Sequence, residues 1–311
     1  MLLKRLGNMR IAWLAPVALA FAPPAAAAPA VAKAVPAAKA QTSAEPKPAL
    51  WLLSDEDTKI YLFGTIHMLP PGFKWRSAAF DKVAAEASEL VVETYDAPGE
   101  IDEAEIAAMF IAAEPRPILD RVPKNKRKAL KRAIKETKLP REAFDYMHSW
   151  AAAMMIGLGQ IYGSYGVDDP AEAPGVEDSL EAEFKAAGKP ILSIEDGKAV
   201  LEGLNALPEA VQVQLLLDGL GEVELAPGEN PVDDDAWARG EAEAMDVLEE
   251  LPPEMYDVLV KRRNAAWTLW LEERLKRPGT LLVAVGAGHL AGPDSVQAML
   301  GAKGLVARRV N

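Results

Sequence analysis

Two of the three histidines in this 311-residue chain share one local pattern, in which an apolar run is followed by Gly-x-x-His. The first motif runs from Gly64 to His67 after YLF, and the second runs from Gly286 through Gly288 to His289 after TLLVAV. Glycines at these places let the backbone turn sharply or approach a ligand closely. Because open α/β sheets bind ligands beyond the carboxyl ends of their strands, we expect both imidazoles to meet at one site.

Glu93 ends a further apolar run, ELVVE, and is the carboxylate that we expect beside His67 and His289. Two imidazoles and a carboxylate suit a divalent metal such as Mn, Co or Zn. Such a metal lowers the pKa of a bound water, which can then attack a carbonyl. Without a metal, the same groups would act as general acid and base, and the role of Glu93 as ligand or base stays open. His148, within DYMHSW, lacks this context and is expected to be structural.

Other kinds of chemistry find no support in the sequence. There is no Gly-x-Ser-x-Gly, His-Glu-x-x-His or Gly-x-x-x-x-Gly-Lys motif, and no cysteine to act as a nucleophile or form a disulfide. The formal charge is −12, and removal of an N-terminal segment with three cations and no acids would make it about −15. An anion of this size repels nucleic acid, and we expect the basic run KNKRKALKR to be a solvated helix face.

The elements that position these residues follow an α/β pattern. A hairpin predicted from Leu50 to Gly64 leads through the first motif to a helix and then to the strand ELVVE. The same order of strand, Gly-x-x-His, helix and strand recurs with TLLVAV, Pro293–Leu300 and LVARRV. We therefore predict a central sheet formed by two related units, with a large helical insertion between them. The remaining predicted elements are a strand in Lys189–Asp196 and helices over Glu103–Ala112, Lys124–Thr137, Arg141–Ile161, Val176–Ala187, Ala199–Leu204, Glu209–Leu217, Asp234–Leu251 and Glu254–Lys276.

The N-terminus has the composition of an export signal. A basic start, an apolar run of about a dozen residues and small residues near Ala28 predict a signal peptide over residues 1–28. The alternative is an uncleaved anchor, although the run is short for a membrane span. Residues 29–49 are rich in Ala and Pro and predict a flexible linker before one domain over residues 50–311. We expect a periplasmic or secreted protein without a stable membrane span after cleavage.

Five segments together resemble the TraB/PrgY/GumN family, which includes the Tiki metalloproteases. They are YLFGTIHMLP, SAAFDKVAAEASELVVE, VEDSLEAEFKAAGKPILSIED, KRRNAAW and LLVAVGAGHLAGPDSVQAMLGAKG, in the order of the family and across the domain. More distantly, the chain is similar to erythromycin esterases and ChaN-like proteins. The segment HSW at His148 departs from the Pro-Trp-like pair that the family leads us to expect.

The resemblance implies an α/β fold in which His67, Glu93 and His289 face a common site. It implies metal-dependent hydrolysis of a peptide or small acyl substrate, with Arg263 orienting a carboxylate or an oxyanion. An alternative is a non-catalytic peptide-binding or pheromone-binding protein of the same fold. A third possibility, by analogy with ChaN-like proteins, is the binding of haem or iron.

Overall fold

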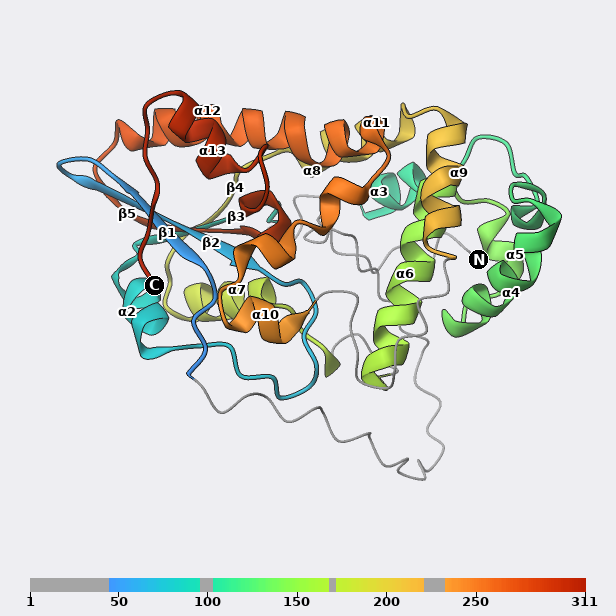
Figure 1. The fold of residues 1–311 in the computed structure, drawn as a ribbon, viewed down its shortest axis with the longest axis horizontal. Coiled ribbons are helices and arrows are strands. Elements are labelled where there is room, and N and C mark those ends of the chain that lie inside the picture. Colours follow the sequence, from blue (N-terminus) through green and yellow to red (C-terminus); the bar gives the residue numbers. More distant parts are fainter. Residues whose placement is uncertain (1–44, 96–102, 168–171, 221–232) are drawn as a thin grey trace. The chain divides into compact units, whose positions relative to one another are not determined.

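The structure, a computed structural model, describes residues 45–95, 103–167, 172–220 and 233–311. These residues belong to two compact units. The sheet unit comprises described residues 45–95, 174–200 and 233–311, and the helical unit comprises residues 103–167, 172–173 and 201–220. The predicted α/β class is confirmed, and the helical unit is the large insertion that the sequence indicated (Figure 1).

The predicted signal peptide over residues 1–28 and most of the predicted linker over residues 29–49 lie outside the described residues. The last linker residues belong to the sheet unit. The backbone N–H of Lys47 donates to the carbonyl of Ala238 at 2.7 Å, and Pro48 and Ala49 are buried. The end of the predicted linker, from Lys47 to Ala49, is therefore packed on the sheet unit.

Six strands form one sheet in the order β4-β3-β5-β2-β1-β6 (Figure 1). Their bounds are β1 Leu50–Ser54, β2 Thr58–Thr65, β3 Glu89–Val92, β4 Ile191–Ser193, β5 Gly279–Gly286 and β6 Arg308–Arg309. β4, β3, β5 and β2 are parallel neighbours, whereas β1 is antiparallel to both β2 and β6. The two Gly-x-x-His motifs therefore leave adjacent strands, and Thr65 is in register with Gly286. The second motif is followed by a shorter strand than LVARRV predicted.

Helices cover both faces of this sheet, which explains why its parallel strands are almost continuously apolar. One face packs against α2 (Ala78–Glu86), α7 (Val176–Ala186) and α10 (Asp234–Ala238). The other packs against α12 (Arg262–Leu275) and α13 (Val296–Ala302). Along β5, Leu282 and Ala284 belong to the first core, and Leu281, Val283 and Val285 belong to the second.

The helical unit contains short helices packed on a long one. Their bounds are α3 Glu103–Met109, α4 Arg127–Glu136, α5 Arg141–Phe144, α6 Ser149–Tyr165, α9 Glu209–Asp218 and, partly in this unit, α8 Gly197–Asn205, with 3-10 turns at Ile118–Asp120 and Lys124–Lys126. The single helix predicted over Arg141–Ile161 is wrong. Buried Arg121 donates to the carbonyls of Asp145 and Met147, and Ala112 and His148 form backbone bonds that separate α5 from α6. These tertiary hydrogen bonds replace those of a continuous helix.

A second predicted helix, Asp234–Leu251, is also shorter in the structure. α10 ends at Ala238, and Gly240 has a φ of +77°, the left-handed conformation in which glycine commonly terminates helices. Residues Ala242–Met245 and Val247–Glu250 form 3-10 turns instead. The helix predicted over Glu254–Lys276 forms almost as expected, as α11 (Pro253–Tyr256), a π-helical segment (Asp257–Lys261) and α12.

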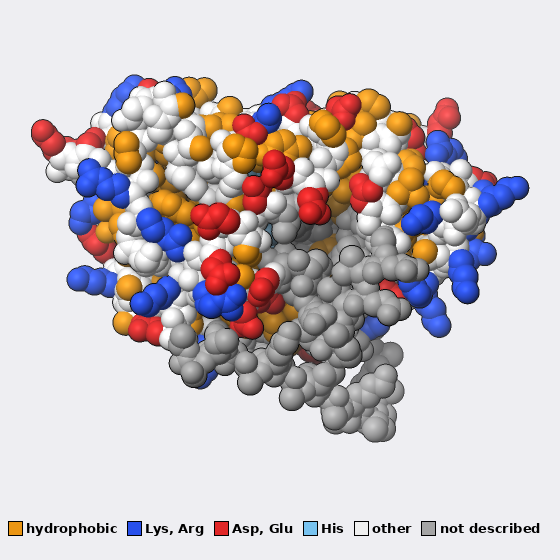
Figure 2. All heavy atoms as spheres, in the orientation of Figure 1, with side chains coloured by type: hydrophobic (Ala, Val, Ile, Leu, Met, Phe, Trp, Pro, Cys, Tyr) orange, Lys and Arg blue, Asp and Glu red, His pale blue; other side chains and the backbone are white. Residues whose placement is uncertain are grey.

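Basic side chains gather on the surface of one helix. Figure 2 shows Lys and Arg side chains gathered where α4 lies, and this helix buries Leu130, Ala133 and Ile134 while its cations face outward. The prediction of a solvated basic helix face therefore fits α4. Among the described residues, none of the helices combines the length and apolar character needed to cross a membrane.

Candidate functional site

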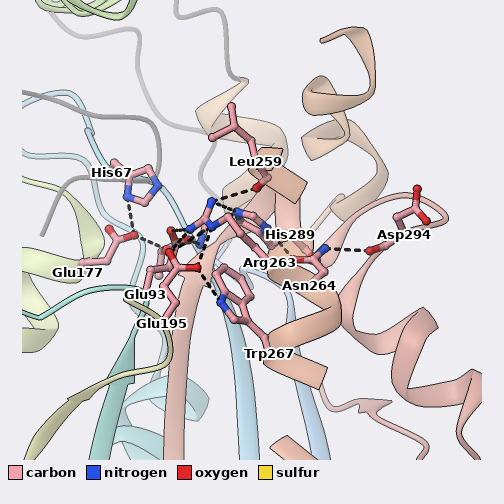
Figure 3. A network of polar contacts seen from close by, with 12 residues as sticks. His67, Glu93, Glu177, Glu195, Leu259, Arg263, Asn264, Trp267, His289 and Asp294 are labelled. Carbon is pink, nitrogen blue, oxygen red and sulfur yellow. Dashed lines mark hydrogen bonds and ion pairs between the residues drawn. The ribbon is translucent and has the colours of Figure 1, made fainter. Parts of the chain in front are cut away.

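The carboxyl ends of four parallel strands bring together the polar residues of the site (Figure 3). His67 follows β2, Glu93 follows β3, Glu195 follows β4 and His289 follows β5. Arg263, from the first turn of α12, reaches the same edge. The shared edge that the sequence predicted for His67, Glu93 and His289 thus exists, and all five residues belong to the sheet unit.

Arg263 lies at the centre of this arrangement and is only 6% exposed. Its Nη2 donates to Glu93 Oε2 at 2.5 Å and to Glu195 Oε1 at 2.6 Å. Its Nε donates to Glu195, and its Nη1 donates to His289 Nε2 at 3.0 Å and to the carbonyl of Leu259 at 3.1 Å. A guanidinium has five N–H donors, so Arg263 uses all of them within the protein.

Trp267 supports the guanidinium from the next turn of α12. The Arg263 guanidinium carbon lies 4.8 Å from the centre of the Trp267 ring, a distance at which a cation and an aromatic face attract each other. The indole N–H donates to Glu195 Oε2 at 2.9 Å. Glu195 is therefore held by two partners, and Arg263 is fixed between a ring and two carboxylates.

Asn264 fixes the tautomer of His289. Its amide nitrogen donates to the backbone carbonyls of Asp294 and His289, at 2.8 and 3.3 Å, so the amide oxygen must face the other way. That oxygen lies 2.7 Å from His289 Nδ1, which must therefore carry the proton. The lone pair of His289 is consequently on Nε2, where it accepts the hydrogen bond from Arg263.

His67 is held by a carboxylate instead. Its Nδ1 lies 2.7 Å from Glu177 Oε1, which also accepts from the hydroxyl of Thr65. Glu177 stands in the first turn of α7, and the start of this helix docks directly on the His67 backbone. A Cβ on Gly175 would lie 2.3 Å from the His67 carbonyl oxygen, so only glycine permits this approach.

The two histidines have opposite electrostatic environments. Burial disfavours protonation of both, but for His67 the charge and hydrogen bond of Glu177 outweigh burial and raise its pKa. For His289, burial lowers the pKa, and the nearby Arg263 and His67 lower it further. The pKa of His289 therefore lies well below the usual 6.5. Perturbed groups concentrated at one sheet edge are typical of a functional site.

The carboxylates differ as well. Burial is the main cause that raises the pKa of Glu195, and the neighbouring charge of Glu93 raises it further. The charge of Arg263 acts in the opposite direction. Burial would raise the pKa of Glu177 too, but the charge of His67 and the hydrogen bonds from His67 and Thr65 together outweigh it, so the pKa lies below the usual 4.5. Burial tends to lower the pKa of Arg263, yet Glu93 and Glu195 raise it overall. The guanidinium therefore stays charged.

The side chains of the three predicted metal ligands approach one another beside Gly286. A Cβ on Gly286 would lie 3.2 Å from Glu93 Oε1 and 3.2 Å from His67 Nε2, so these atoms are at most twice that distance apart. Glu93 Oε1 is 3.9 Å from His289 Nε2 and accepts from the Gly286 N–H at 2.7 Å. Within the part of the chain that the structure describes, no three His, Asp or Glu side chains adopt a metal-binding arrangement, and Arg263 occupies His289 Nε2.

The motif glycines make close contacts within the protein, and their approach to a ligand stays a prediction. Gly64, Gly286 and Gly288 are not among the described glycines with positive φ. Gly64 lets β2 approach the Cα of Ala287, which a Cβ would meet at 3.1 Å. Gly288 similarly lies against the side chain of Leu248.

Four residues of the network are not among those predicted from the motifs. Glu177 and Glu195 lie in VEDSLEAEFKAAGKPILSIED, and Asn264 and Trp267 lie in KRRNAAW, two of the segments that resemble the family. Glu195 also follows an apolar strand, as Glu93 does, and this position could have identified it. Glu177 has no such signal, because it reaches His67 only through the docking of α7.

The third histidine is not part of this network. His148 belongs to the helical unit, where it precedes α6 and its ring stacks at 6.5 Å, centre to centre, on that of Trp150. Burial lowers its pKa. The structural role that its sequence context suggested agrees with this position.

Comparison with known proteins confirms the family resemblance that the five segments indicated. The sequence profile of the TraB/PrgY/gumN family matches residues 49–309, which includes both Gly-x-x-His motifs, Glu93 and Arg263. A search of curated proteins gives no match. Because the profile covers most of the chain, this protein belongs to the TraB/PrgY/gumN family.

Proposed function

We propose that this protein is a hydrolase of a peptide or other acyl bond, with His67, Glu93 and His289 as its reacting centre. The observation that carries the proposal is their convergence around Gly286, with each imidazole held through Nδ1 and directing Nε2 inward. Partners at Nδ1 orient histidines that act as ligands or bases and fix which nitrogen is free. A purely structural histidine does not need this arrangement.

In chemical type, although not in the arrangement that the structure shows, the donors suit a divalent metal, and His67, Glu93 and His289 are the residues that would hold it. Two neutral imidazole nitrogens and a carboxylate oxygen are common ligands for Mn, Co or Zn, and Gly286 leaves the space between them free of a Cβ. Glu177 and Asn264 would be the outer partners that orient the ligands. A bound metal would supply a water of lowered pKa at neutral pH.

The residues of the chain provide the remaining parts of such a reaction. Glu93 is fixed by Arg263 and by the backbone N–H of Gly286, so it presents a defined oxygen toward His67 and can accept a proton there. Arg263 is the positive charge closest to this carboxylate and would stabilise negative charge that develops beside it. The same groups provide an acid and a base if no metal takes part.

The test compares the purified protein with variants on a mixed peptide library, with Mn, Co or Zn added and with a chelator. We expect chelator-sensitive cleavage that Glu93→Gln and His67→Ala reduce by at least about 100-fold, as for the loss of an acid–base group. His148→Ala, which alters the histidine of the helical unit, is the matched control and should retain activity. Equal activity in all four proteins would overturn the proposed centre.

A second candidate function, peptide binding without cleavage, is favoured by one observation. All five N–H donors of Arg263 and both oxygens of Glu93 already form hydrogen bonds within the protein. Groups that are bonded in this way hold a rigid site and are not free to react. This candidate predicts that peptides bind with His67-dependent affinity and are recovered uncleaved from the library.

We further propose that the protein is exported and acts in the periplasm or outside the cell. The support is the pattern of residues 1–28, with its basic start, apolar run and small residues. N-terminal sequencing of protein from the periplasmic fraction should find a start near Ala28 or Pro29. An intact Met1 in a membrane fraction would instead indicate an anchor.

A further inference from the structure

The guanidinium of Arg263 lies where a metal bound to His289 would have to lie. Imidazole has one lone pair, in the plane of the ring, and Asn264 places it on Nε2. Arg263 Nη1 donates into that lone pair at 3.0 Å. A cation that binds His289 through Nε2 must therefore break this hydrogen bond. The two cannot be present on His289 together.

The same arginine also competes for Glu93. Its Nη2 binds Oε2 of this carboxylate, and the full positive charge lies beside the space that the metal would enter. In a buried site this charge repels a divalent cation strongly, because little water is present to screen it. Arg263 thus opposes metal binding through one hydrogen bond and through its charge.

Glu195 gives Arg263 a position to which it can remain attached. It binds Nε through both carboxylate oxygens, at 2.9 and 3.1 Å, and Nη2 at 2.6 Å. Trp267 in turn bonds Glu195 and lies under the guanidinium. The contacts with Glu195 and Trp267 use Nε, Nη2 and the ring face, so none of them depends on the Nη1 hydrogen bond to His289.

We propose that Arg263 is an internal competitor of the divalent cation, with Glu195 as the residue that retains it when the cation binds. This inference rests on the proposed function, because it assumes that His67, Glu93 and His289 take a metal. Loss of the His289 bond leaves one N–H of Arg263 Nη1 free at the reacting centre. Arg263 would then offer this N–H as a donor to an oxyanion at the centre.

The test measures the affinity of the purified full chain for Co²⁺ alone, by calorimetry and by the visible absorption of the bound ion. Arg263→Gln should bind Co²⁺ about tenfold or more tightly than the unaltered protein, since one charge-assisted hydrogen bond no longer has to break. Glu195→Gln should bind it several-fold more weakly, because the charge of Arg263 is then less neutralised. Arg262→Gln, at an exposed neighbour whose side chain is 72% accessible, should leave the affinity unchanged.

A double variant separates competition from simple charge and from misfolding. Arg263→Gln with Glu195→Gln removes one positive and one negative charge, so the formal charge of the cluster is kept and no unpaired Glu195 remains. Tighter Co²⁺ binding in this folded double variant supports the competition. Equal or weaker binding overturns it.

Histidine variants separate the two proposals. If the unaltered protein binds Co²⁺ in a His67-dependent manner and Arg263→Gln does not bind it more tightly, the competitor is wrong and the metal centre stands. If neither the unaltered protein nor the Arg263 variants bind Co²⁺ in a His67-dependent manner, the metal centre and the competitor are both wrong. If binding persists in His67→Ala and His289→Ala, the ion occupies another site and both are again wrong.

Discussion

The two Gly-x-x-His motifs are alike in sequence and in position, yet the protein treats their histidines in opposite ways. The two motifs follow the adjacent parallel strands β2 and β5. Their first glycines, Gly64 and Gly286, are offset by one residue in the register of these strands. His67 is held by the carboxylate of Glu177, whereas His289 is held by the amide of Asn264 and faces Arg263. The pKa is therefore raised in one and lowered in the other.

This difference shows that a repeated motif sets the location of a side chain but not its chemistry. The strands and glycines place both imidazoles at the same sheet edge. The charge of each is decided by a helix that docks from elsewhere in the chain, α7 for His67 and α12 for His289. One imidazole is thus suited to carry a proton and the other to offer a lone pair, a division that acid–base chemistry uses.

The largest change expected in this comparison comes from Arg263→Met. It removes the cation that faces His289 and leaves Glu93 and Glu195 buried without it, which should lower the free energy of unfolding by about 3–5 kcal/mol. Urea denaturation followed by circular dichroism measures this value. Arg262→Met, at the exposed neighbouring position, should change it by less than about 0.5 kcal/mol.

Adding Glu195→Gln to Arg263→Met should recover part of the loss, because one buried carboxylate then loses its charge. If Arg263→Met is as stable as Arg262→Met, the carboxylates do not depend on Arg263, and the account of the His289 side is wrong.

A smaller loss should follow from Gly175→Ala, which separates α7 from the His67 backbone. The new methyl group would lie 2.3 Å from the His67 carbonyl oxygen and 2.7 Å from its carbon, so the helix must shift. Strain of this kind typically costs about 1–3 kcal/mol. We expect thermal unfolding to show it, together with a weaker contact between Glu177 and His67.

Gly163→Ala is the matched control for this change. Gly163 lies in α6, and a Cβ there meets nothing within 4 Å. Alanine is also the better helix former, so stability should stay the same or rise by about 0.5–1 kcal/mol. Similar losses for the two variants would mean that the close approach at Gly175 is not a constraint.

Glu177→Gln should have a modest effect on stability and a clear one on His67. The side chain keeps its shape and an acceptor oxygen but loses its charge, so the hydrogen bond becomes a neutral one at a cost of about 1 kcal/mol. The pKa of His67 should fall, which nitrogen-15 NMR can follow because the chain has only three histidines.

Glu183→Gln, on the same helix, is the control for that experiment. Glu183 pairs with Arg76 at the surface, where both side chains are about one-third exposed, and such pairs contribute little. An unchanged pKa of His67 in Glu177→Gln would show that Glu177 does not control this histidine.

The sequence predicted the elements whose signal is local. The hairpin of β1 and β2, the apolar strands β3 and β5 and the shared edge of His67, Glu93 and His289 all follow from apolar runs and the polar residues that end them. Two predicted helices are interrupted in the structure. Arg141–Ile161 is divided by hydrogen bonds from Arg121, which is distant in the chain, and Asp234–Leu251 ends early at the left-handed backbone of Gly240. Apolar periodicity encodes neither feature.

Within the site, the sequence identified His67, Glu93 and His289 at strand ends but missed Glu195 at a fourth, and it missed Glu177 and Asn264, which orient the histidines. Glu177 is far from His67 in the chain, and only the approach at Gly175 brings them together. Arg263 was predicted to orient a carboxylate or an oxyanion, and the structure places it on two carboxylates, Glu93 and Glu195. Such partners depend on helix docking, which no short motif specifies.

The smallest expected effect concerns how the free energy of unfolding depends on pH. His67→Gln and His289→Gln should change this dependence in opposite directions. The raised pKa of His67 means that the folded state binds more protons there, so its contribution to stability is present below pH 6.5 and is lost as pH rises through the folded pKa. The lowered pKa of His289 means that the unfolded state binds the proton more tightly, so stability falls as pH drops below 6.5. Between pH 8 and 5.5, His67→Gln should therefore lose more stability on acidification than the unaltered protein, and His289→Gln should lose less. Urea denaturation at several pH values measures both slopes, and slopes that change in the same direction would show that the two motifs are electrostatically equivalent.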